Sequence, residues 1–167
     1  MIQLNFGGHR SSDPNLLAGP LKHQKTLIWA RSQVASIAKR RRSADAFFKS
    51  LALKRSLTEL IADNSIWVSY VATTVYYGEI DRMGGREIGI SELAFSEGRQ
   101  MVLATLIHEL AHAAGAAIAG THDAERAVLE CGLGNYSEAR TGKDDLRTPY
   151  APGLIGSVGR PRTSTLA

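Results

Sequence analysis

The segment LIHELAHAAG, residues 106–115, constrains the fold of this 167-residue chain more strongly than any other. His108 and His112 stand four residues apart in a run of apolar residues that recur at helical spacing. On a helix this separation places both imidazoles on one face, one turn apart. The segment therefore predicts a helix over about residues 97–114 that ends at Gly115. The expected inner face of this helix consists of Met101, Ala104, Ile107, Leu110, Ala111 and Ala114.

The two histidines are spaced as two ligands of one tetrahedral Zn²⁺ ion would be, in the pattern His-Glu-x-x-His. Glu109 lies beside them and can reach a water at the metal without being a ligand itself. Zinc with three protein ligands keeps one position for water, whose pKa it lowers to about 7. The sequence therefore predicts a hydrolytic zinc site in which His108 and His112 bind the metal and Glu109 is the catalytic base.

A third zinc ligand is expected on a following helix, predicted over residues 121–131 with Thr121 as its N-cap. The apolar face of this helix would be formed by Ala124, Ala127, Val128 and Cys131. Glu125 lies about 100° from the centre of that face, so it is the acidic residue most turned toward the interior. We favour Glu125 as the third ligand, with His122 and Asp123 as alternatives. Alternatively, Glu125 has no role at the metal and forms a surface salt bridge with a nearby arginine.

The remaining elements follow from periodicity and turn residues. Two N-terminal helices and two strands are predicted, over residues 21–41, 43–63, 66–77 and 86–95. The segment GEIDRMGG, residues 78–85, is expected to be the turn between the strands. Ser96 is expected to cap the helix that carries the histidines.

The fold class expected from these elements is α+β, with a small antiparallel or mixed sheet followed by the active-site helix. Residues 1–20 are expected to form an irregular arm and residues 158–167 a flexible tail. One domain would span residues 21–157, helical over 21–65 and carrying the catalytic core over 66–157.

The net charge is unevenly distributed along the chain. Residues 1–65 carry 11 Lys and Arg against 4 Asp and Glu, and the sequence KRRR stands at 39–42. These cations fall where the first helix should end, and cations there complement the helix dipole. A nucleic-acid-binding protein that uses this basic half is the alternative, but no groove-reading motif accompanies the cluster, so nucleic acid is an unlikely partner.

The single cysteine, Cys131, excludes an intramolecular disulfide and is expected to be a small buried residue. No window approaches the roughly 18 apolar residues that a membrane span needs. The first 15 residues lack the pattern of a secretory signal. We therefore expect a protein made in the cytoplasm without a signal peptide and, if it acts outside the cell, exported by a signal-independent system.

The order of a strand, a helix with HELAH and a glycine turn resembles the zincin superfamily of zinc metallopeptidases, over about residues 66–131. The resemblance implies a zincin-like fold, peptide-bond hydrolysis, the zinc ligands His108 and His112, and Glu109 as general base. It also implies that the strand before the helix, EIGISEL at 87–93, binds the substrate as an added β-strand.

The zincin subfamilies differ in their third ligand. Ile118 stands where a metzincin has its third histidine, and no methionine follows the motif helix. The letters GTHD at 120–123 match the aspzincin pattern but lie closer to the helix than in that family. A gluzincin takes its third ligand from a glutamate on the following helix, for which Glu125 and Glu130 are the candidates.

The small basic chain and its AERAVLECG segment also resemble metallopeptidase toxin domains of bacterial polymorphic and type VI secretion effectors. This resemblance implies a protein or peptide substrate and a cognate immunity or inhibitor protein. A non-catalytic, regulatory zinc-binding module on the same scaffold is the alternative to an enzyme. The donor that would stabilise the reaction's oxyanion is left open among His122, Tyr136, Arg140 and Tyr150.

Overall fold

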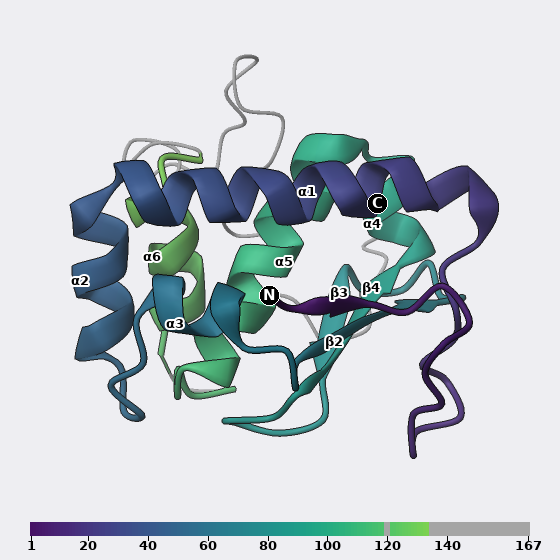
Figure 1. The fold of residues 1–167 in the computed structure, drawn as a ribbon, viewed down its shortest axis with the longest axis horizontal. Helices are drawn as coiled ribbons and strands as arrows, with labels where there is room; N and C mark the ends of the chain where they lie inside the picture. The colour runs from purple at the N-terminus through teal and green to yellow at the C-terminus, as the bar shows by residue number, and fades with distance from the viewer. Residues whose placement is uncertain (119–120, 134–167) are drawn as a thin grey trace, which may run out of the picture.

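The computed structural model describes residues 1–118 and 121–133 (Figure 1). Within this part, the chain forms a mixed four-stranded sheet and six helices. The α+β class with a small mixed sheet and a helical N-terminal part is therefore confirmed. No helix in the described part is both long enough and apolar enough to cross a membrane.

The sheet has the strand order β1-β2-β4-β3. Its strands are β1 (Gln3–Leu4), β2 (Trp67–Val71), β3 (Gly78–Ile80) and β4 (Glu87–Ser91). β2 pairs in parallel with both β1 and β4, whereas β3 runs antiparallel to β4 at the far edge. The predicted strand 66–77 is thus shorter than expected, and the arm expected to be irregular contains β1.

Strand β3 lies inside GEIDRMGG, so the prediction of that whole segment as a turn is wrong. Gly78 pairs with Ile90 and Ile80 with Ile88, and only residues 81–86 remain to connect the two strands. Glycine normally weakens a strand, and an isolated glycine in a strand often marks a close approach by another element. Here that element is the helix that carries the histidines, and pairing with β4 outweighs the turn preference.

The predicted strand 86–95 ends at Ser91, where a short helix α4 (Glu92–Ser96) begins. The Ser91 hydroxyl accepts a hydrogen bond from the Ala94 amide at 3.3 Å, which caps this helix. Ser96, predicted as the cap of the next helix, is instead the last residue of α4. Its hydroxyl donates to the Leu93 carbonyl at 2.8 Å.

The helix predicted over residues 97–114 is α5 (Arg99–Ala113), and it begins after Gly98 with a φ of 106°. Every residue from Met101 to Ala113 is buried, so α5 is covered on all sides. It packs against β3 and β4 on one side and against α1, α4 and α6 elsewhere (Figure 1). The six residues expected on the inner face are therefore only part of the buried surface of α5. This agrees with the general rule that a helix with apolar residues around most of its circumference lies inside the fold.

Helix α1 (Leu21–Arg40) matches the first predicted helix closely. The second prediction, one helix over 43–63, is wrong because the chain forms α2 (Arg42–Ser50) and α3 (Leu57–Ala62) instead. Lys54 takes a φ of 55° in the connection between them. Ser56 and Glu59 then form a capping box that starts α3, which is the S-x-x-E signal for a helix start.

Helix α6 (Asp123–Glu130) is shorter than predicted, and Thr121 does not cap it. His122 occupies the N-cap position without a side-chain hydrogen bond. Its apolar face is confirmed, because all four expected residues are buried: Ala124, Ala127, Val128 and Cys131. The placement of the KRRR cluster is also confirmed, since these four cations are exposed where α1 ends and α2 begins.

The N-terminal arm covers the face of the sheet that is turned away from α5. His9 stacks on Trp67 with ring centroids 4.1 Å apart, and its Nε2 lies 2.8 Å from Glu87 Oε1. Leu16 lies over Gly89, where a Cβ atom would come within 2.7 Å of the Leu16 side chain. The sheet is thus enclosed between the arm and α5.

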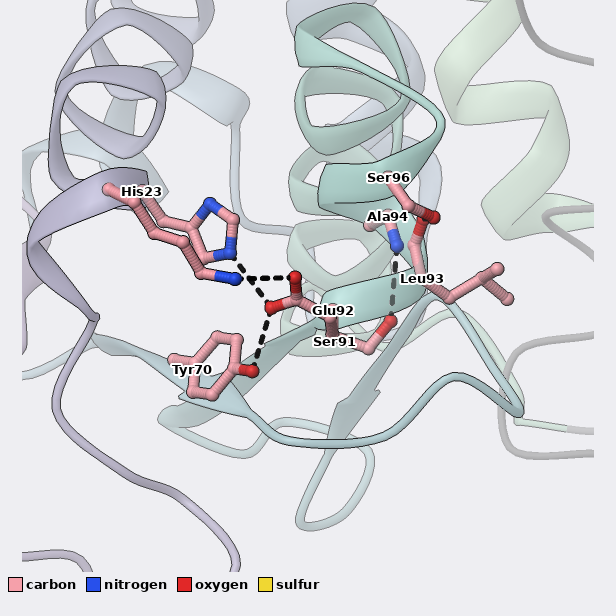
Figure 2. A network of polar contacts seen from close by, with 8 residues as sticks. His23, Tyr70, Ser91, Glu92, Leu93, Ala94 and Ser96 are labelled. Atoms are coloured by element: carbon pink, nitrogen blue, oxygen red, sulfur yellow. Dashed lines mark hydrogen bonds and ion pairs between the residues drawn. The ribbon is translucent and has the colours of Figure 1, made fainter.

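One polar network joins α1, β2 and α4 beside the sheet (Figure 2). The Glu92 carboxylate accepts hydrogen bonds from Lys22 at 2.8 Å, His23 at 2.8 Å and Tyr70 at 2.7 Å. The His23 ring also stacks on Phe95 at a centroid distance of 3.8 Å. The hydrogen bonds from Lys22, His23 and Tyr70 lower the pKa of Glu92 to about 2. The ionised carboxylate is therefore the form that holds the three elements together.

Replacing Glu92 by Gln should destabilise the protein by about 1–2 kcal/mol at neutral pH. This figure allows for the partial exposure of the Glu92 carboxylate, which lets solvent weaken its interactions. Because the pKa of Glu92 is lower in the folded state, its contribution is complete above its ordinary pKa of 4.5 and is lost as the pH falls toward about 2. Urea unfolding at about pH 5.5 and pH 2.5 should show the two proteins converging at the lower pH. Glu97→Gln, at an exposed position in the α4–α5 connection, is the control. A Glu92→Gln deficit that persists unchanged at low pH would contradict this role.

Candidate metal centre

Helix α5 places the two histidines of the HELAH motif side by side in the interior. His108 is 3% exposed and His112 6% exposed. Their Nε2 atoms are 3.1 Å apart. Two nitrogens bound to one tetrahedral zinc ion at its usual distances are about 3.3 Å apart. The pair is thus already arranged as two ligands of one ion would be.

The orientation of His112 is fixed by the turn that ends α5. Its Nδ1 lies 2.9 Å from the Ala116 carbonyl, which can only accept a hydrogen bond, so Nδ1 carries the proton and Nε2 keeps its lone pair in the neutral ring. Gly115 makes this possible with a φ of 101°. A backbone carbonyl on the second nitrogen is the usual way in which proteins orient a metal-binding histidine. The predicted end of the helix at Gly115 therefore also builds part of the site.

His108 is held in its neutral form. Burial lowers the pKa of His108 to about 3, and the neighbouring His112 lowers it further in the same direction. Its Nδ1 is buried and has no hydrogen-bond partner in the structure. A neutral imidazole is the form that binds a metal ion, so no proton has to be displaced at neutral pH.

Glu109 is fully buried, and neither of its carboxylate oxygens has a hydrogen-bond partner. Burial raises the pKa of Glu109 well above its ordinary value, and the nearby charge of Glu79 raises it further. An unpartnered carboxyl group in the interior costs several kcal/mol relative to a packed apolar side chain of similar size. A buried carboxyl group with a strongly shifted pKa is a candidate for a chemical role.

Strand β3 approaches the site from the side of Glu109. A Cβ atom on Gly78 would lie 2.5 Å from Thr105 Cγ2 and 3.0 Å from Glu109 Oε1. The hydroxyl of Thr105, one turn before Glu109, is likewise buried and without a partner. Sequence reasoning missed Gly78 because it assigned β3 to a turn, and without β3 beside it Thr105 was one more residue of a predicted helix. The signal that could have found Gly78 is an isolated glycine next to β-forming residues in TTVYYGEI.

The third ligand is the part of the predicted site that the structure does not assemble. In residues 1–118 and 121–133, no three His, Cys, Asp or Glu side chains are grouped so that they could hold a metal ion. Glu125 and Asp123 are half-buried on α6 and His122 is exposed at its start. The choice among these three therefore stays a prediction. Three of the candidate oxyanion donors lie outside the described residues: Tyr136, Arg140 and Tyr150.

The expectation that EIGISEL binds the substrate as an added strand is wrong. Within the described chain, β4 is already paired on both sides, with β2 and with β3, so no backbone edge is left for a peptide. The strand at the edge of the sheet on this side is β3. β3 also packs against α5 beside Glu109, so it is the edge that lies next to the site.

Comparison of the chain with models of protein families, with curated proteins and with solved structures finds no match.

Replacing Gly78 by Ala should disturb the site directly, because the new methyl group meets Thr105 and the Glu109 carboxylate. We expect a loss of about 1–3 kcal/mol of stability, the usual cost of inserting a methyl into a packed interior. Gly8→Ala is the matched control, since a Cβ atom there meets nothing within 4 Å. Thermal unfolding of both variants checks the prediction. Equal stability of the Gly78→Ala and Gly8→Ala variants would show that β3 is not closely packed against Thr105 and Glu109.

Proposed function

We propose that this protein is a zincin-like zinc metallopeptidase, which hydrolyses peptide bonds at the site formed by His108, Glu109 and His112. The observation that carries the proposal is the unpartnered, fully buried carboxyl group of Glu109 on the same helix as two buried histidines whose Nε2 atoms are 3.1 Å apart. A histidine pair with only a packing role would not require an adjacent buried glutamate. That glutamate is costly to the fold unless the site uses it.

Two of the residues present, His108 and His112, are placed as ligands of one zinc ion would be. His112 offers Nε2 because Ala116 holds its Nδ1 proton. The neutral ring of His108 would offer Nε2 once its proton lies on Nδ1 instead of in the hydrogen bond between the two rings. When bound, zinc would polarise the substrate carbonyl and make a water molecule acidic enough to act as a nucleophile near neutral pH. Glu125 is the third ligand that we favour, with His122 and Asp123 as the alternatives.

Glu109 would handle the protons of the reaction. Its carboxylate accepts the proton of the attacking water, and the resulting carboxylic acid delivers that proton to the nitrogen of the leaving amine. The surrounding apolar groups of α5 keep bulk water from this carboxyl group. Gly78 leaves the space in which its Oε1 lies.

The peptide substrate would pair with the outer edge of β3. An extended peptide bound to this edge gains main-chain hydrogen bonds without a demand on its side chains. Its backbone would then run beside Glu109, because β3 contacts that residue through Gly78. This assignment replaces β4 with β3 as the substrate strand.

The setting in which the peptidase acts rests on sequence resemblance alone. The likeness to secreted effector domains supports export without a signal peptide and control by a cognate inhibitor protein. A regulatory zinc-binding module without activity is the second candidate, and it would keep the metal ligands but have no use for Glu109. The burial of Glu109 therefore favours the enzyme.

Purified protein should contain about one zinc ion per chain, and His108→Ala/His112→Ala should contain almost none. Zinc should raise the thermal unfolding temperature of the native chain, because the ion binds the folded state.

Glu125→Ala should weaken zinc binding at least about tenfold, as loss of a ligand does, whereas Asp123→Ala should not. Competition with a chelator measures zinc binding by the native chain, by the three variants above and by His122→Ala. Full zinc content in the double histidine variant would disprove the metal site, and damage confined to Asp123→Ala or His122→Ala would reassign the third ligand.

Glu109→Gln should keep the fold and the zinc but lose peptidase activity by several orders of magnitude, because an amide cannot accept the proton of the water. Cleavage of a quenched fluorescent peptide library, read by fluorescence and mass spectrometry, provides the assay. Glu97→Gln, an exposed position outside the proposed site, is the control for loss of one carboxylate. If Glu109→Gln cleaved peptides at a normal rate, the assigned role would be wrong; if the native protein bound zinc but cleaved none, the regulatory module would be favoured.

A further inference from the structure

A groove separate from the metal centre runs along α1. Two adjoining hollows, of about 450 Å³ and 310 Å³, share Met1, Ala35 and Lys39 in their lining. One extends along α1 itself and the other lies between α1 and α3. We call this pair of hollows the α1 groove. The α1 wall of the larger hollow consists of Ile28, Arg31, Ser32, Ala35, Ser36 and Lys39.

The spacing of the α1 wall matches the contact surface of a second helix. The six residues follow an i, i+3, i+4, i+7, i+8, i+11 pattern, which is one face of α1 over about 16 Å. Ile28 is 47% exposed at one end of the groove. Ile61 and Ala62 of α3 line the groove opposite α1. Together with Ala35 they form an apolar bottom, which we call the floor of the groove. A groove of this length and character accommodates about three turns of an amphipathic helix.

The charge of the groove is positive and unbalanced. α1 contains no Asp or Glu in its 20 residues. Arg31 and Lys39 border the groove, and neither forms an ion pair within the described part of the chain. Within the described residues, Arg31 makes a hydrogen bond only to the Ile2 carbonyl, at 3.3 Å. The two cations are eight residues apart, so they are separated by about 12 Å along the helix.

We propose that the α1 groove binds an amphipathic helix of a partner protein, with an apolar stripe for the floor and acidic residues about two turns apart for Arg31 and Lys39. Nucleic acid fits this surface less well, because an apolar floor between two cations offers little to a phosphate backbone. The proposal does not depend on the metal centre, since none of its residues belongs to the groove. Such a surface is suited to control of the protein by a binding partner.

The test uses a designed fluorescent peptide helix of about 18 residues, long enough to be partly helical in water. Leucines at i, i+3, i+4 and i+7 form its stripe, and glutamates two turns apart flank it. A matched peptide carries lysines in place of the glutamates. Fluorescence anisotropy should show saturable binding of the acidic peptide to the full chain and much weaker binding of the basic one.

Arg31→Glu/Lys39→Glu should weaken binding of the acidic peptide at least about tenfold, because each attraction becomes a repulsion. Arg10→Glu/Arg86→Glu makes the same charge change at exposed positions outside α1 and should leave binding within about twofold. Ala35→Trp, which fills the groove without a change of charge, should also abolish binding, and thermal unfolding confirms that each variant folds. The proposal is overturned if the acidic peptide does not bind, if the control double variant weakens binding equally, or if a short DNA duplex binds the same residues more tightly than the peptide.

Discussion

The burial of α5 from Met101 to Ala113 is the constraint on which the rest of the structure depends. This helix carries His108, Glu109 and His112 and has the sheet on one side and other helices around the remainder. Polar groups can be kept in such a place only if hydrogen bonds, a metal ion or a proton compensates for lost hydration. The Ala116 carbonyl does this for one nitrogen of His112, whereas His108 Nδ1 and both carboxylate oxygens of Glu109 are buried without a hydrogen-bond partner. The site is therefore part of the core and not an addition to its surface.

Sequence reasoning found the elements that local chemistry determines. The spacing of His108 and His112, Gly115 at the helix end and the apolar face of α6 each depend on neighbours along the chain, and each is present in the structure. The long helix α1 follows from the same kind of periodicity. The capping box of Ser56 and Glu59 carried an equally local signal, and attention to it would have divided the second predicted helix correctly.

The features that escaped prediction depend on partners distant in sequence. Gly78 and Glu79 form a strand only because β4 is beside them, and no property of GEIDRMGG by itself indicates that pairing. The same pairing fills the second edge of β4, which is why a substrate strand chosen by its order in sequence was the wrong one. Ser96 is a good N-cap residue by type, but Ser91 caps a helix that the alternating pattern concealed. The third ligand has the same difficulty, since its choice depends on how α6 is placed relative to α5.

The position of β1 has a consequence for the order in which the molecule can fold. The first strand pairs in parallel with β2, and the Asn5 side chain bonds to Ser69 across a separation of 64 residues. At ordinary rates of protein synthesis, roughly 3–13 seconds pass between the emergence of these two segments. During that interval the N-terminal helices can form, but the arm has no sheet to cover. Closure of the arm over Trp67 and Gly89 is thus a late event in folding. Until it occurs, the face of the newly formed sheet that carries these two residues is exposed to water.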